Sequence, residues 1–212
     1  MTETKTGKLH YAWLIFIGCC FVNAASMAAS ISIVGVYLLP VSSSIGVGPG
    51  DWMLWMTVCS IVSCIMTSIW GQFLQTKNIN VVTSVSAAAL AIAVFAFSFG
   101  NSVQWFWIWG GVLGFAMPCI ATLTVPTLIG NWFGKKYSGK LLGIAAAFTG
   151  VGTFCWAPLF TMIIQNLGWQ MAYQLNAALI AVCLLPWTLF VFKFKPEDKG
   201  LEPYGYDAAL EA

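Results

Sequence analysis

The chain alternates between long apolar stretches and short polar segments. Within residues 11–192 the charged side chains are only Asp51, Lys77, Lys135, Lys136 and Lys140. A membrane-spanning helix takes about 20 residues. The uncharged intervals therefore fit one, one, two and two spans: residues 11–50, 52–76, 78–134 and 141–192. This pattern predicts an all-α, polytopic membrane protein with six transmembrane helices.

Turn residues place the expected boundaries of the spans. Pro40 is expected to end the first span, and Asp51 to cap the N-terminus of the second. The expected spans cover residues 11–39, 52–75, 79–99, 105–132, 138–165 and 169–192. This leaves three regions: a terminal segment 1–10, a helical bundle 11–194 and a tail 195–212.

Lysine placement predicts the orientation of the bundle. All nine basic residues are lysines, and an N-terminus in the cytoplasm places every one of them in a cytoplasmic segment. The positive-inside rule thus predicts that both termini are cytoplasmic. We expect a multi-pass protein of the plasma membrane. Tryptophans near the opposite helix ends are expected to form an outer aromatic belt. They are Trp52, Trp55, Trp105, Trp107 and Trp169.

Polar residues follow one face of the first span. Asn23, Ser26, Ser30 and Tyr37 recur at helical spacing, so they share a face that points into protein or into a water-filled cavity. Ordinary hydrogen bonding between helices explains the same face equally well.

Small residues recur every fourth position on three other spans. The fourth span carries Gly110, Gly114, Pro118, Thr122 and Pro126. The second span carries Ser60, Ser63, Thr67 and Gly71, and the fifth carries Gly139, Gly143, Ala147 and Gly150. Such stripes let helix backbones approach closely, so those on the second and fifth spans predict packing seams. A hinge role for Gly143 and Gly150 is the functional alternative.

The sequence contains no group of residues typical of an enzyme active site. His10 is the single histidine and lies at the opposite membrane face from Ser102, so a serine–histidine pair is excluded. The seven cysteines lie in apolar stretches without metal-ligand spacing, as expected of small core residues. The sequence predicts no enzyme activity, no metal, no cofactor and no nucleic-acid partner. It also carries no acidic residue inside a span, where a proton relay would need one.

Several short motifs carry a family resemblance. They are Asn131-Trp132-Phe133-Gly134-Lys135-Lys136, Gly143-Ile144-Ala145, Gly150-Val151-Gly152, Pro158-Leu159, Gly168-Trp169 and Phe194-Lys195-Pro196-Glu197-Asp198-Lys199-Gly200-Leu201. In this order they resemble the major facilitator superfamily, in particular the oxalate/formate antiporter-like members. Three positions depart from the family pattern: Gln75 replaces an aspartate, and Gly110 and Gln170 replace arginines.

The resemblance implies one six-helix half, built from two three-helix repeats, of a twelve-helix transporter. Such a half moves small solutes by alternating access, with organic anions such as monocarboxylates, oxalate or formate as the candidate class. Its partners are then the lipid bilayer and either a second copy or a C-terminal half. A truncated, inactive fragment or a membrane interaction partner is the alternative function.

The family's helix roles assign the polar and small residues to two groups. The spans that line the transport path carry Asn23, Ser26, Ser30, Tyr37 and Thr122. Residues expected to act in helix packing or gating are Gly71, Lys77, Gly114, Pro118, Gly143, Gly150 and Pro158.

Overall fold

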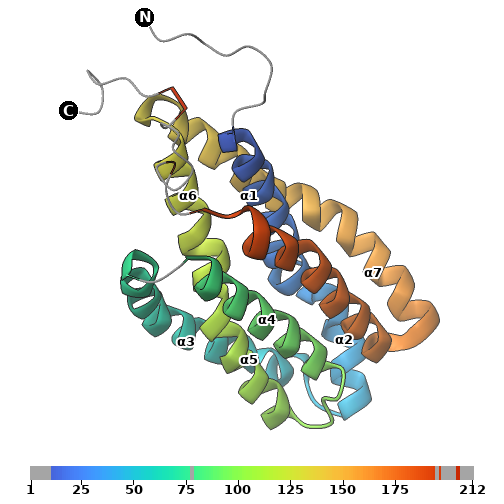
Figure 1. Ribbon diagram of the computed structural model, residues 1–212. Helices are drawn as coiled ribbons and strands as arrows, with labels where there is room; N and C mark the ends of the chain where they lie inside the picture. Colours follow the sequence, from blue (N-terminus) through green and yellow to red (C-terminus); the bar gives the residue numbers. More distant parts are fainter. Residues whose placement is uncertain (1–10, 77–78, 194–195, 197–203, 206–212) are drawn as a thin grey trace, which may run out of the picture.

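The computed structural model describes residues 11–76, 79–193, 196 and 204–205. In this part of the chain every regular element is a helix, and no strand is present beyond an isolated bridge between Phe133 and Tyr204 (Figure 1). Five helical stretches are long and apolar enough to cross a membrane. They are Tyr11–Ile45, Pro49–Leu74, Ile79–Phe97, Val103–Trp132 and Lys135–Val191.

The first stretch contains three helical segments: α1 (Tyr11–Met27), the π-helical segment η1 (Ala28–Ser32) and α2 (Val34–Ile45). Its predicted end at Pro40 is wrong, because Pro40 lies inside α2. Neighbouring groups in a helix bundle can compensate for the backbone hydrogen bond that proline lacks. The helix instead ends at Gly46, whose φ of +69° gives a left-handed C-cap that closes the last turn onto Ser42 and Ser43.

The second stretch is α3 (Pro49–Thr76), followed by α4 (Ile79–Phe97). Pro49 occupies the first turn of α3, a position where its missing N–H has no helical partner to lose. Asp51 therefore lies within the first turn, and its predicted place at the N-cap is wrong. Its carboxylate remains next to the positive end of the helix dipole.

The fourth stretch contains α5 (Val103–Met117), the π-helical segment η2 (Pro118–Thr124) and α6 (Val125–Trp132). The first and fourth stretches thus share a design, in which a π-helical segment follows the first α-helix. In each segment a hydroxyl bonds the carbonyl five residues earlier. Ser32 donates to Met27 over 3.4 Å, and Thr124 donates to Cys119 over 2.6 Å.

The last stretch contains α7 (Lys135–Pro186) and the π-helical segment η3 (Trp187–Val191). Gly168 interrupts α7 with φ 84° and ψ 164°, a conformation that glycine adopts without steric penalty. The chain folds back there, so α7 has a first arm, residues 135–167, and a second arm, residues 169–186 (Figure 1). The turn lies in the gap between the expected spans 138–165 and 169–192.

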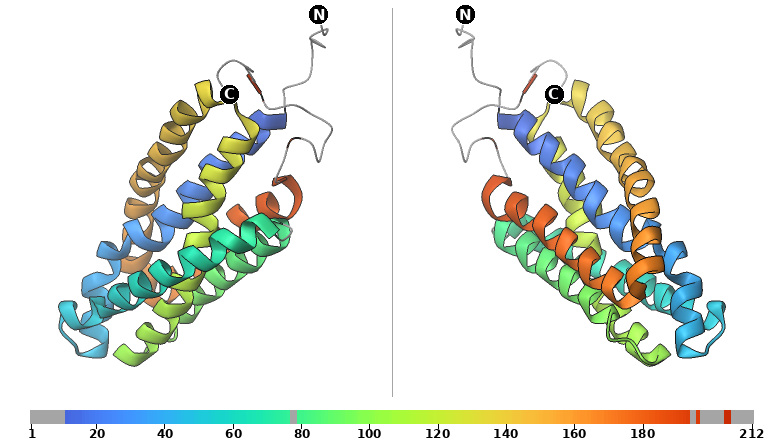
Figure 2. Two further views of the ribbon diagram at one scale, coloured as in Figure 1. Left: turned by 90° about the vertical axis from the view of Figure 1, so that its left-hand side faces the viewer. Right: turned by 90° about the vertical axis from the view of Figure 1, so that its right-hand side faces the viewer.

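The helices pack as a single elongated bundle (Figure 2). The main contacts pair α3 with α5, α1 with α7, and α4 with both α5 and α7. The start of α1 and the α6–α7 junction lie at one end, and the α2–α3 and α4–α5 turns at the other (Figure 1). Lys135, Lys136 and Lys140 therefore lie at the opposite end from Asp51.

The predicted outer aromatic belt is only partly correct. Trp107 is exposed, but Trp52 and Trp55 are buried in the bundle, where they pack edge to face on Phe106 and Phe97. The sequence placed both tryptophans near the start of α3, but the packing of α3 on α5 determined that their side chains point into the bundle.

Candidate functional site

Four of the five predicted path residues are buried inside the bundle in this conformation. Asn23, Ser26, Ser30 and Tyr37 are each at most 7 % exposed. Thr122 in η2 is exposed. Contact of these five side chains with a transported solute stays a prediction.

Asn23 and Ser26 have hydrogen-bond partners within the bundle. The Asn23 side-chain amide donates to the main-chain carbonyl of Ala145 in α7, over 2.9 Å. The Ser26 hydroxyl donates to the carbonyl of Val22 in its own helix, over 2.6 Å. In this conformation Asn23 therefore forms a hydrogen bond between two helices, as expected if the polar face of the first span serves helix packing.

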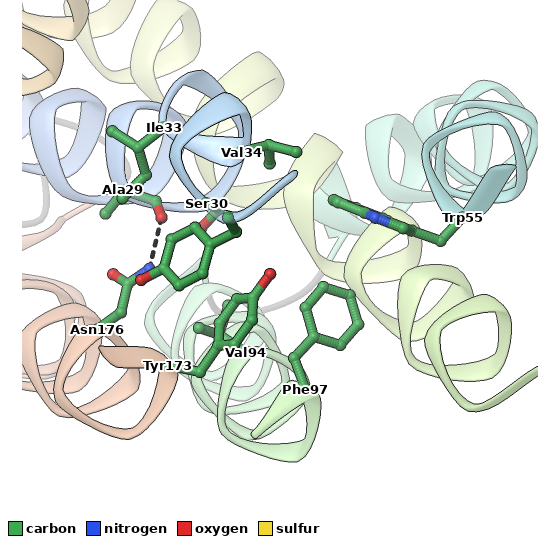
Figure 3. Close-up of a pocket in the computed structure, with 10 residues that line it drawn as sticks. Ala29, Ser30, Ile33, Val34, Trp55, Val94, Phe97, Tyr173 and Asn176 are labelled. Carbon is green, nitrogen blue, oxygen red and sulfur yellow. Dashed lines mark hydrogen bonds between the residues drawn. The ribbon is translucent and has the colours of Figure 1, made fainter. Parts of the chain in front are cut away.

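Ser30 and Tyr37 line a small cavity of about 10 Å³ inside the bundle, called the central polar cavity below (Figure 3). Trp55, Tyr173 and Asn176 bring further polar groups to it from α3 and α7. The Tyr37 and Tyr173 rings stack with their centroids 4.1 Å apart. These five residues are called the central polar cluster below.

Sequence reasoning missed two members of this cluster. Tyr173 and Asn176 lie three residues apart on the second arm of α7, and Gln170 precedes them at the same spacing. The Asn176 side-chain amide donates to the carbonyl of Ala29 in η1, over 2.7 Å. The available signal was this run of polar residues at the start of a span, since polar side chains in a membrane require polar partners.

A second and larger cavity, of about 320 Å³, lies near the start of α1 and α7. Aromatic rings line most of it, and Lys140 brings a positive charge. Tyr204 closes one side, because its N–H donates to Trp132 over 2.9 Å and its carbonyl accepts from Gly134 over 3.1 Å. The described chain thus returns to the α6–α7 junction after η3.

The contact between α3 and α5 depends on glycine. A Cβ at Gly114 would collide with the Cys59 main chain, and one at Gly110 would lie 3.0 Å from the Trp55 carbonyl. Close approach lets Ser63 donate to the Gly114 carbonyl over 3.0 Å. Gly114 lies at this contact, and its assignment to helix packing or gating stays a prediction.

The contact between α1 and the first arm of α7 also depends on a glycine that faces a main-chain carbonyl. A Cβ at Gly152 would lie 2.7 Å from the Ala24 carbonyl oxygen, so the two backbones touch. Trp156 donates its indole N–H to that carbonyl over 2.9 Å. Gly152 was not singled out in the predicted stripe of this span.

The predicted stripe on the fifth span faces away from the bundle, whereas the stripe on the second span is divided: Ser63 contacts α5, and Gly71 has open space around it. A Cβ added at Gly71, Gly143 or Gly150 would meet no described atom within 4 Å. Pro158, on the same arm as Gly143 and Gly150, is exposed too. A packing or gating role for these residues, within a larger assembly, stays a prediction. Lys77, assigned with them, lies outside the described residues.

The stripe on the fourth span does not stay on one face. Gly110, Gly114 and Pro118 are buried, whereas Thr122 and Pro126 are exposed. Pro118 begins η2, and a π-helical segment advances by more residues per turn than an α-helix. The four-residue repeat therefore rotates out of the bundle beyond Pro118.

The described interior offers hydrogen bonds and apolar contacts without charge. Every side chain that lines the central polar cavity is uncharged, and no acidic or basic residue falls in 141–192 or 79–134. Such a set can orient polar groups, but it cannot neutralise an ion. All seven cysteines are free, and four of them are buried.

Comparisons with known proteins agree with this architecture. The sequence profile described as Major Facilitator Superfamily matches residues 12–207. No curated protein sequence matches the chain. The fold is similar to that of a bacterial homologue of the human lysosomal transporter Spinster, solved in an inward-facing and unoccupied conformation. The TM-score is 0.73 at 14% sequence identity.

The alignment covers 97% of this chain and 47% of the Spinster homologue, so the chain spans about half the length of that transporter. The low identity makes this a likeness of fold. The match to the family profile, in contrast, covers residues 12–207, which is nearly the whole chain. The chain belongs to the Major Facilitator Superfamily, a family of multi-pass membrane transporters rather than enzymes.

Proposed function

We propose that the chain is one half of a secondary transporter that moves small solutes across the plasma membrane by alternating access. The paired interruptions of its helices carry this proposal. The π-helical segment η1 follows a 17-residue helix, and η2 follows a 15-residue helix. Interrupted helices at corresponding positions in repeated units mark the solute sites of many transporters.

In this proposal the bundle crosses the membrane six times, as two three-helix repeats, with both termini cytoplasmic. Two sets of contacts support the repeats. In each set a glycine on one helix touches the backbone of the other, and a tryptophan donates to a carbonyl across the contact. The sets are Gly114 with Trp70 for α3 and α5, and Gly152 with Trp156 for α1 and α7.

The transport path lies on the side of the bundle that carries exposed Thr122. Asn23, Ser26, Ser30 and Tyr37 become accessible when α1 moves relative to α7 in the alternating-access cycle. Local rearrangement at η1 supports such motion, because π-helical segments have weaker geometry and concentrate at functional sites. The path is completed by a second copy or by a C-terminal half.

Two exposed faces support a partner of this kind. Gly71 on α3, and Gly143 and Gly150 on the first arm of α7, leave open space where a second helix could approach closely. The chain also spans 47% of the solved transporter that it resembles.

Organic anions, such as monocarboxylates, oxalate or formate, are the candidate substrate class. The resemblance to oxalate/formate antiporters supports the class. The uncharged interior adds a condition, since the positive charge that binds a carboxylate must come from the partner half.

Uptake into proteoliposomes tests the proposal. The purified assembly is reconstituted, and entry of radiolabelled oxalate, formate and lactate is measured against protein-free vesicles. We expect uptake of at least one anion, blocked by Thr122→Trp and retained in Phe154→Trp, where Phe154 is 82 % exposed. Absence of uptake by an intact assembly would favour the inactive fragment or the interaction partner.

A further inference from the structure

Five buried polar atoms of residues that line the central cavity have no hydrogen-bond partner among the described groups. They are Ser30 Oγ, Tyr37 OH, Trp55 Nε1, Tyr173 OH and Asn176 Oδ1. Their residues are each at most 7 % exposed, so bulk solvent cannot satisfy them. Buried polar atoms in folded proteins almost always have a partner, and five in one cavity need a common explanation.

The surroundings of the cavity show why the helices alone do not satisfy these atoms. Asn176 already uses its side-chain amide N–H on the Ala29 carbonyl, which leaves its oxygen as an acceptor. The Tyr37 hydroxyl lies next to the Asn176 side chain, close enough for the two groups to satisfy each other. The remaining walls are apolar and come from residues such as Ile33, Val94 and Phe97.

The size of the cavity limits the occupant to one small molecule. About 10 Å³ is close to the smallest space that holds a water molecule, and it is far too small for an organic anion. The transported solute therefore does not bind here in this conformation.

The donors and acceptors select water over an ion. Trp55 can only donate, Asn176 Oδ1 can only accept, and the three hydroxyls can do either. A metal cation would face the positive end of the Trp55 N–H dipole, with no carboxylate in the lining to bind it. A water molecule both donates and accepts, so it complements this mixed set.

We propose that the central polar cavity binds one ordered water molecule, which joins η1 and α2 of the first span to α3 and α7. In this arrangement Asn176 fixes the site through Ala29, and the water makes up to four hydrogen bonds, with Asn176, Ser30, Tyr173 and Trp55 as its candidate partners. The inference rests on the geometry of the bundle and does not depend on the proposed transport function.

Thermal unfolding of the purified chain in detergent tests the bound water. If Tyr173 shares a hydrogen bond with the water, Tyr173→Phe should lower the Tm by about 2–4 °C. Ser30→Ala should also lower the Tm, and the double variant should lose less than the sum because both groups serve one water. Tyr11→Phe is the control: its hydroxyl donates to Val191 over 2.7 Å, at a distant site, so its effect should add to that of Tyr173→Phe.

Two outcomes would overturn the inference. An unchanged or raised Tm in Tyr173→Phe would mean that the hydroxyl has no partner, since removing an unpaired buried polar group relieves a penalty. Strict additivity of Ser30→Ala and Tyr173→Phe would mean that no shared molecule links them. A crystal structure of the same chain, at a resolution that shows ordered water, should place one density peak among Ser30, Tyr173 and Asn176.

Discussion

Trp156 donates its indole N–H to the main-chain carbonyl of Ala24, 2.9 Å away, one helical turn beyond the contact of Gly152 with the same carbonyl. A related pair lies at the other main contact: Trp70 of α3 donates to the Phe115 carbonyl of α5 over 2.7 Å, next to Gly114, which faces the Cys59 main chain. Two helix pairs are therefore held by the same combination: a glycine allows close approach, and an indole bonds an exposed carbonyl.

Loss of the indole hydrogen bond should weaken the contact between α1 and α7. Trp156→Phe keeps an aromatic ring but removes the donor, and should lower the free energy of unfolding by about 0.5–1.5 kcal/mol. The measurement is denaturant titration in detergent micelles. Trp107→Phe, at an exposed position in α5, is the matched control and should change little. Equal losses in the two variants would contradict the assigned role of Trp156.

The contact at Gly152 should not tolerate even one methyl group. In Gly152→Ala the new Cβ would lie 2.7 Å from the Ala24 carbonyl oxygen, so the helices must separate. We expect a loss of about 1–3 kcal/mol, typical of overpacking. Gly130→Ala, in α6 with no atom within 4 Å of its added Cβ, should leave stability unchanged or raised. The difference between the two variants is measured by the same titration, and its absence would argue against direct contact.

A second glycine pair gives an independent comparison at the contact of α3 with α5. In Gly114→Ala the new Cβ would collide with the Cys59 backbone, whereas in Gly111→Ala it would meet only Val58, at 3.8 Å. Gly114→Ala should therefore reduce the Tm in detergent by several degrees, while Gly111→Ala should leave it close to the original. A similar Tm for both variants would show that α3 and α5 lie further apart.

Asn23 should contribute to stability through its bond to Ala145 in α7. Asn23→Leu preserves the size of the side chain but removes the hydrogen bond, and should cost about 0.5–2 kcal/mol in unfolding free energy. Asn166→Leu is the control, because exposed Asn166 bonds only to Met162 of its own helix. A stable Asn23→Leu chain that loses uptake would instead favour direct contact of Asn23 with the solute.

Accessibility to thiol reagents should separate the predicted path residues. In a background without native cysteines, Thr122→Cys should react quickly with a water-soluble maleimide, since Thr122 is exposed. Ser26→Cys should react slowly in the same assay, since Ser26 is 0 % exposed. Addition of the transported anion should increase the rate at position 26 if α1 moves during transport. A rate that stays low with and without solute would remove Ser26 from the path.

Several features of the fold could be predicted because they depend on short stretches of sequence. The lengths of the uncharged intervals predicted where helices form, and the expected span bounds at residues 165 and 169 placed a turn next to Gly168. The boundary at Pro40 was wrong because α2 continues through this proline, whose missing hydrogen bond neighbouring helices can compensate. The boundary at Asp51 was wrong because Pro49 already occupies the first turn of α3. Contacts with neighbouring helices cannot be seen in a local sequence pattern.

The central polar cluster was harder to predict. Ser30 and Tyr37 belonged to a visible stripe, but Tyr173 and Asn176 come from the last span and Trp55 from the second. Three helices far apart in sequence bring these groups to one cavity. Periodicity can show that a residue shares a face with its neighbours along the helix, but it cannot show which other helix meets that face.

The sequence by itself determined the helical class, the apolar lengths, the family and the separation of Asp51 from the lysines at the other end of the bundle. These features depend on hydrophobicity and on local backbone preference. Only the tertiary structure decided which side of each helix is buried: Trp52 and Trp55 point inward, while Gly143 and Gly150 face away from the bundle. The physical reason is that helices pack on particular faces, and the π-helical segments rotate those faces part-way along a span.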